Sequence, residues 1–231
     1  MIRLDMTREE LLNELNMDLS WAMDRVDGIS IKYKRILNDK KRPDGIFHHC
    51  WYTTPRNNRV CVIYEKKRVA GDVCVNVNAF FKVLGDDGKE RYIMNHFYLG
   101  EHYVKECFLF TNHFVQRLRE RVGMDFESWF IERVRKKEET FEVFDYDYNG
   151  VDNQCYAILN GNMAFGIRSN TFDVVFTTLI VKGQEKLNQL RMHHKAFQSN
   201  CESEKELTAV RESMYRKRFE RRSRSDKRMR W

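Results

Sequence analysis

Residues 111–123, with the sequence TNHFVQRLRERVG, carry the side chains best suited to chemistry on a phosphate group. His113, Arg117 and Arg121 recur at every fourth position, so a helix with 3.6 residues per turn places them in one row along its surface. An imidazole titrates near neutral pH and can accept or donate a proton. The two guanidinium groups stay charged and match the geometry of phosphate oxygens. The row therefore combines a proton-transfer group with two phosphate-binding cations.

The same segment predicts the helix that positions this row. Thr111 or Asn112 can cap its N-terminus with a side-chain oxygen, and Gly123 can end it in a left-handed conformation. A neighbouring row of apolar side chains would face the core, and it consists of Phe114, Val115, Leu118 and Val122. The alternative is an ordinary solvated helix face, because arginine and glutamate beside an apolar row are also typical of surface helices. A single histidine at a helix start can equally cap or pack.

The segments after this helix lead to a family resemblance. A second helix is predicted from Asp125 to the charged run at 135–139, followed by strand-like segments at 140–148, 154–168 and 172–181. This order, with His113, Arg117, Glu120 and Arg121 ahead of the strand VVFTTLI at 174–180, resembles the small domains related to RelE-type and BrnT-type toxins. Those domains belong to the barnase, colicin and RelE group of metal-independent ribonucleases. The resemblance covers residues 108–181, about a third of the chain.

The resemblance implies a metal-independent endoribonuclease, or a relative that binds RNA without cleaving it. Cleavage through the 2′-hydroxyl of RNA needs a base for that proton, an acid for the departing 5′-oxygen and cations over the developing charge. In the implied site, His113 transfers a proton and Arg117 and Arg121 stabilise the phosphate charge. Thr177 or Thr178, on the last strand, donates a hydrogen bond to the same phosphate. The resemblance also leaves room for a protein partner or inhibitor.

Positive charge is concentrated at the C-terminal end of the sequence. The chain has a formal net charge of +7, and residues 216–231 alone contain nine basic and two acidic side chains. Nine clustered cations release counterions from nucleic acid, and Tyr215, Phe219 and Trp231 can stack on unpaired bases. We therefore predict that this segment binds nucleic acid, RNA rather than DNA. A solubilising end or a contact with an acidic protein is the alternative. The nine cations are Arg216, Lys217, Arg218, Arg221, Arg222, Arg224, Lys227, Arg228 and Arg230.

The rest of the chain predicts an α+β fold. Thr7 and Glu10 fit a capping box ahead of apolar residues at helical spacing up to Gly28, and the alternation of Ile29, Ile31 and Tyr33 predicts a strand at 29–34. Residues 40–45 are predicted as a turn or an exposed loop. The segments 46–53, 60–64, 73–83 and 92–99 then predict an antiparallel meander, and 103–110 is a strand or a short helix. We predict three regions: 1–107 (helix plus β-rich), 108–183 (ribonuclease-like) and 184–231 (helical, with a basic end that is disordered until an anion orders it).

Several other classes of protein and site lack a signal. No run of about 18 apolar residues indicates a membrane span, and the N-terminus does not read as a secretory signal, so we expect a cytoplasmic protein. Six scattered cysteines favour reduced, mostly buried thiols. The run His48-His49-Cys50 lacks the spacing of a zinc site, and we predict no metal site and no cofactor. The alternative function is a structural or scaffolding protein, for example of a phage particle, whose basic end contacts nucleic acid or a partner.

Overall fold

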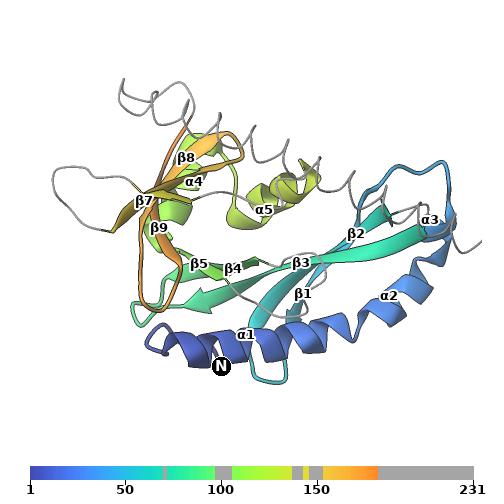
Figure 1. Ribbon diagram of the computed structural model, residues 1–231, viewed down its shortest axis with the longest axis horizontal. Coiled ribbons are helices and arrows are strands. Elements are labelled where there is room, and N and C mark those ends of the chain that lie inside the picture. The colour runs from blue at the N-terminus through green and yellow to red at the C-terminus, as the bar shows by residue number, and fades with distance from the viewer. Residues whose placement is uncertain (70–71, 97–105, 137–142, 146–152, 182–231) are drawn as a thin grey trace, which may run out of the picture. The chain divides into compact units, whose positions relative to one another are not determined.

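The computed structural model describes residues 1–69, 72–96, 106–136, 143–145 and 153–181 (Figure 1). Met1–Gln184 group into one compact unit. The predicted boundary between residues 107 and 108 lies inside a strand of that unit, Glu106–Phe110. The helices predicted after residue 184 and the basic segment 216–231 lie outside the described residues.

The fold is α+β, as the sequence predicts. The helices are α1 (Arg8–Met23), α2 (Val26–Lys32), α3 (Lys34–Asn38), α4 (Asn112–Val122) and α5 (Phe126–Arg135). The strands are β1 (Gly45–Thr53), β2 (Arg59–Val69), β3 (Asp72–Leu84), β4 (Glu90–His96), β5 (Glu106–Phe110), β6 (Val143–Asp145), β7 (Gln154–Leu159), β8 (Asn162–Ile167) and β9 (Val174–Ile180).

All nine described strands belong to one sheet, in the order β1-β2-β3-β4-β5-β9-β8-β7-β6. Strands β1 to β5 pair antiparallel with their neighbours, which confirms the predicted meander. Strand β5 pairs parallel with β9, and the chain between them carries α4, α5 and β6 to β8. A parallel pair requires such a crossover, because a short hairpin can join only antiparallel strands.

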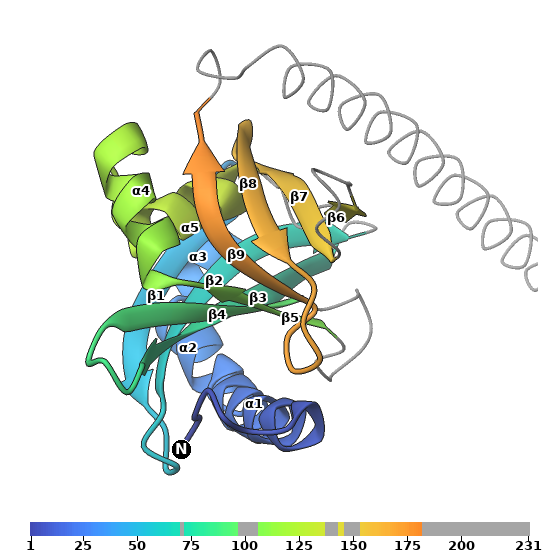
Figure 2. The same cartoon turned by 90° about the vertical axis from the view of Figure 1, so that its left-hand side faces the viewer.

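Helices cover both faces of the sheet. Figures 1 and 2 show α1 on one side and α4 and α5 on the other, with the sheet curving around α4 and α5. Along β2, Val60, Val62 and Tyr64 pack with α1, whereas Cys61 and Ile63 pack in the core that includes α4 and α5. Alternate residues of a strand point to opposite faces, so a strand covered on both sides needs a continuous apolar run.

Local caps define the first helix. The Thr7 side chain accepts from the backbone N–H of Glu10, and Glu10 Oε2 accepts from the backbone N–H of Thr7 at 2.9 Å, which confirms the capping box. The helix ends earlier than predicted, at Met23, and two shorter helices follow it.

The strand predicted at residues 29–34 is wrong, because this segment lies in α2 and the start of α3. The prediction required Ile29, Ile31 and Tyr33 to share one buried face. Instead Ile29 packs in the α1 core and the Tyr33 ring lies 5.4 Å from Phe47, while Ile31 is 75% exposed. Two partly buried residues four apart, with an exposed one between them, have the helical period and not the period of a strand.

A two-residue Asn-Gly turn joins two of the described strands. Asn160 (φ 50°) and Gly161 (φ 74°) are both left-handed and connect β7 to β8. Asparagine and glycine tolerate this conformation, which matches the twist of the flanking strands. A second Asn-Gly pair of the sequence, at 149–150, lies outside the described residues.

Candidate functional site

The helix that carries the candidate row forms as the sequence predicts. The side chain of Thr111 caps α4 by accepting from the backbone N–H of Phe114 at 3.3 Å. Gly123 follows the helix with φ 74°, in the left-handed region. Phe114 and Leu118 are fully buried. The apolar face is therefore fixed in the core, and the opposite edge presents His113 and the arginines.

The sheet brings α4 alongside the strand that ends in threonines. Phe110, the last residue of β5, pairs with Phe176 of β9, and the next backbone N–H, of Thr111, donates to the carbonyl of Phe176 at 3.1 Å. Helix α4 therefore begins beside β9 and runs in contact with it. The row on α4 therefore lies close to β9.

The three members of the row differ in their surroundings. His113 is exposed and makes no hydrogen bond or ion pair to any described residue. Arg117 Nη1 donates to Glu120 Oε2 at 2.9 Å, and its Nε atom is buried without an acceptor among the described residues. Arg121 Nη1 donates to the backbone carbonyl of Leu179 in β9. The imidazole is thus free, and each guanidinium already has an acceptor.

Glu120 is the acidic group of this face. Gln116 Nε2 donates to Glu120 Oε1 at 2.7 Å, and Arg117 binds the other carboxylate oxygen. These two contacts, Gln116 first, hold the pKa of Glu120 below its usual value. The carboxylate therefore stays charged at neutral pH and competes with any phosphate that approaches Arg117.

The threonines of β9 lie in the ladder between β8 and β9. Thr177 Oγ1 donates to the backbone carbonyl of Phe165 at 3.3 Å, and Thr178 pairs with Phe165 across the β8–β9 ladder. Within the described part of the chain, no hydrogen bond joins either hydroxyl to the α4 row. The structure brings the predicted residues onto adjacent elements, but it does not converge them on one hydrogen-bonded site.

This arrangement limits the chemistry that α4 can perform. Transition-state stabilisation requires donors that are already aimed at the position of the developing charge. Arg117 must first leave Glu120, with which it forms an exposed ion pair that water screens. Arg121 must leave a carbonyl. A phosphate can displace these contacts, but a preorganised phosphate clamp is not present in the described arrangement.

The histidines of β1 have separate environments. His48 Nδ1 lies 3.1 Å from the Tyr33 hydroxyl, and the imidazole stacks on Tyr33 and Tyr64. Burial, followed by the positive charge of Lys32, lowers the pKa of His48. His49 Nε2 lies 3.7 Å from a carboxylate oxygen of Glu127. Among the described residues, no three His, Cys, Asp or Glu side chains gather in a group that could hold a metal ion.

Five of the six cysteines lie within the described residues, and all five are free thiols. Burial raises the pKa of Cys107 to about 12 and that of Cys155 to about 11. A protonated, buried thiol is a poor nucleophile and a poor metal ligand. Cys107 and Cys155 therefore pack in the core and contribute no reactive group.

Sequence reasoning treated residues 40–45 only as an exposed loop. In the structure the segment from α3 to this loop is a second basic surface, with Lys34, Arg35, Lys40, Lys41 and Arg42 all exposed. The signal for it was the consecutive run Lys40-Lys41-Arg42, three cations without an acidic residue between them.

The described residues thus define an α+β protein with a nine-stranded mixed sheet and an exposed imidazole on one helix face. The chain matches no protein-family model, no curated protein and no solved structure in the comparisons made with each. None of the described helices has the length and apolar character needed to cross a membrane.

Proposed function

We propose that this protein binds single-stranded RNA without cleaving it, and that residues 216–231 supply the main electrostatic contact. The observation that carries the proposal is the segregation of charge. The whole net charge of +7 resides in this segment, and the rest of the chain has equal numbers of basic and acidic side chains. Nine clustered cations give strong, salt-dependent affinity for a polyanion.

The contacts on α4 support a binding function over a catalytic one. A metal-independent nuclease needs its cations free to hold the phosphate, whereas Arg117 is paired with Glu120 and Arg121 with the carbonyl of Leu179. His113 remains the single exposed proton-transfer group of the row. The helix is then a packing element that resembles a ribonuclease helix and lacks its preorganised site.

Single-stranded RNA is preferred over duplex DNA for two reasons. Tyr215, Phe219 and Trp231 lie among the cations, and aromatic rings stack on unpaired bases. The resemblance of residues 108–181 to RelE-type and BrnT-type domains also favours RNA over DNA.

The binding proposal is tested by measuring the affinity of the full-length protein for a labelled single-stranded RNA between 50 and 300 mM salt. Changing the nine basic residues of 216–231 to glutamine should reduce the slope of log K against log salt by about six, since each phosphate contact contributes about 0.7. A control variant, Arg3→Gln with Lys89→Gln and Arg135→Gln, removes three exposed cations that already pair with carboxylates. Equal slopes for the wild type and the nine-residue variant would refute the proposal.

The catalytic alternative is tested with the same RNA in the presence of a chelator. We expect no cleavage by the wild type. Cleavage that disappears in His113→Ala would establish an endoribonuclease and overturn the non-catalytic assignment. No RNA binding by the wild type at any salt concentration would instead favour a structural or scaffolding protein.

A further inference from the structure

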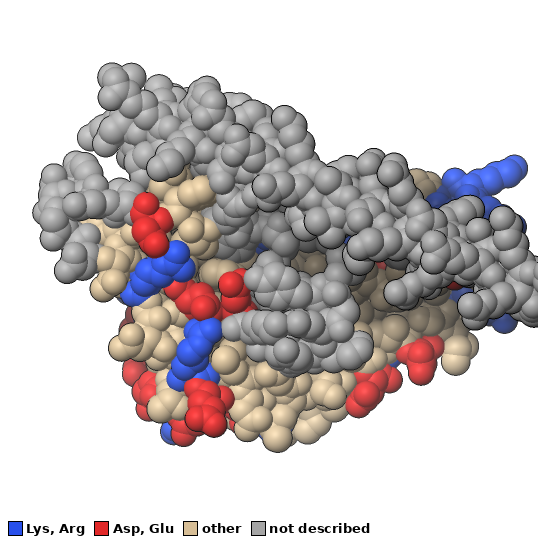
Figure 3. Space-filling model, in the orientation of Figure 1, with Lys and Arg blue, Asp and Glu red and all other residues tan. Residues whose placement is uncertain are grey.

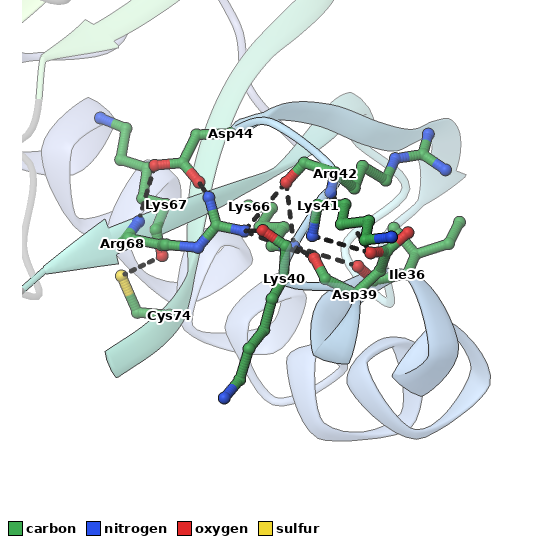
Figure 4. A network of polar contacts seen from close by, with 10 residues as sticks. All are labelled: Ile36, Asp39, Lys40, Lys41, Arg42, Asp44, Lys66, Lys67, Arg68 and Cys74. Carbon is green, nitrogen blue, oxygen red and sulfur yellow. Dashed lines mark hydrogen bonds and ion pairs between the residues drawn. The ribbon is translucent and has the colours of Figure 1, made fainter. Parts of the chain in front are cut away.

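A fully buried lysine organises the chain that follows α3. Lys66, on β2, is 1% exposed, and its ammonium group donates to three backbone carbonyls. The distances are 3.2 Å to Ile36, 2.6 Å to Asp39 and 3.4 Å to Arg42. The last turn of α3 and residues 39–44, here called the basic loop, are therefore fixed on one internal cation (Figure 4).

Arg68, two residues further along β2, binds the same loop. Its Nη2 atom donates to the carbonyls of Asp39, Lys40 and Arg42, at 3.4, 3.0 and 2.9 Å. Its Nη1 atom and its backbone N–H bind the carboxylate of Asp44, at 3.0 and 2.9 Å. Lys66 and Arg68 together thus bind the backbone carbonyls of residues 36, 39, 40 and 42. Arg68 also binds Asp44, which is one of the two acidic residues of the loop.

The second acid of the loop is also engaged. Asp39 Oδ1 accepts from the backbone N–H of Lys41 at 2.9 Å and from that of Arg42 at 3.3 Å. The groups that would repel an anion are therefore bound within the protein. Figure 4 shows the side chains of Lys40 and Arg42 extending away from this network.

The cations on this surface are free. Lys34, Arg35, Lys40, Lys41 and Arg42 are exposed, and none has an ion pair with a described carboxylate. By contrast, several exposed cations elsewhere are paired with carboxylates, as Arg3 is with Asp5 and Arg135 with Glu132. Figure 3 shows basic side chains at the right-hand edge of the molecule, at the end where Figure 1 places α3.

We infer that α3 and the basic loop form a second contact surface for the phosphate backbone of RNA. A phosphate meets three consecutive cations, Lys40, Lys41 and Arg42, on a loop whose backbone is already fixed, so binding costs little ordering entropy. The choice of RNA over an acidic protein rests on the proposed function. A membrane surface is disfavoured because the loop sequence, DKKRPD, contains no large apolar side chain to insert into lipid.

The test compares two full-length variants of equal net charge for single-stranded RNA binding. The loop variant is Lys40→Gln with Lys41→Gln and Arg42→Gln, and the control is Arg3→Gln with Lys89→Gln and Arg135→Gln. Loss of three phosphate contacts should reduce the salt slope by about two and weaken binding at 0.1 M salt by at least about tenfold. The control should retain the wild-type slope. Equal slopes for the two variants would overturn the inference.

The loop surface and the basic segment 216–231 are separable in this assay. Suppose that the nine-residue variant binds RNA like the wild type and the loop variant does not. The proposal that residues 216–231 supply the main contact is then refuted, and the inference about the loop surface is supported. Suppose instead that the loop variant binds RNA like the wild type and the nine-residue variant does not. The inference about the loop surface is then refuted, and the proposed function is supported. Tighter loop-dependent binding to polyglutamate or to vesicles of phosphatidylserine than to RNA would also overturn it.

Discussion

Replacement of Lys66 by methionine tests whether the buried ammonium group holds the basic loop. Methionine keeps the aliphatic volume and removes the three charged hydrogen bonds to the carbonyls of Ile36, Asp39 and Arg42. The carbonyls of Asp39 and Arg42 still have Arg68 as a donor, whereas that of Ile36 loses its side-chain partner. A buried acceptor left without its donor costs about 1–3 kcal/mol, and removing the cation recovers part of its desolvation cost.

We therefore expect Lys66→Met to lower the free energy of unfolding by about 2 kcal/mol. The matched variant is Arg68→Met, which removes contacts to the same loop from a side chain that is 32% exposed. Water can replace its hydrogen bonds, so the loss should be below about 1 kcal/mol. Urea unfolding followed by circular dichroism measures both, and with m near 2 kcal/mol/M the Lys66 variant should shift the midpoint by about 1 M.

The critical result is which of the two variants, Lys66→Met or Arg68→Met, loses more free energy of unfolding. A loss below about 0.5 kcal/mol for Lys66→Met, or a larger loss for Arg68→Met, would refute the reasoning that burial makes this ammonium group the main support of the loop. Unchanged m values for both variants are required for the comparison, because a changed m indicates a different extent of unfolding.

Three further predictions concern the rest of the unit. Gly123→Ala should destabilise the protein by about 1 kcal/mol because φ is +74° there, whereas the control Gly28→Ala, inside α2 with open space around it, should be neutral or stabilising in the same unfolding assay. His48 has a lowered pKa in the folded protein, so its neutral form favours folding above about pH 6.5 and stability falls as the pH drops below that value. The wild type should lose more stability between pH 7 and 5 than His48→Gln, and equal losses would contradict the prediction. The exposed Cys74 should react with a thiol reagent in the folded protein, whereas Cys107, whose pKa is raised to about 12, should react only after unfolding.

Elements with strong local signals were predicted from the sequence. The capping box at Thr7 and Glu10, the start of α4 at Thr111 and its end at Gly123 are all observed. Each is decided by hydrogen bonds or backbone conformations within a few residues, so no distant contact is needed to specify it. The antiparallel meander was predicted for the same reason, from apolar segments separated by turn residues.

The sequence pattern predicted the wrong element where the same residues fitted both the strand period of 2 and the helix period of 3.6. Ile29, Ile31 and Tyr33 fit both a strand and a helix. Packing decided between them, because it covers Ile29 and Tyr33 in part and leaves Ile31 exposed. Short segments are ambiguous because three residues cannot distinguish a period of 2 from one of 3.6.

For the candidate site, the amino-acid sequence by itself determined the α4 row, its caps and the charge of the basic segment, because spacing and side-chain type are local properties. Only the tertiary structure decided that β5 and β9 pair in parallel, which places Arg121 against the carbonyl of Leu179. Only it placed Lys66 and Arg68 beneath a loop at least 22 residues earlier in the chain, where they bind its carbonyls and leave its cations facing outward. These outcomes depend on contacts between distant segments, and a linear pattern carries no information about which acceptor a long cationic side chain will reach.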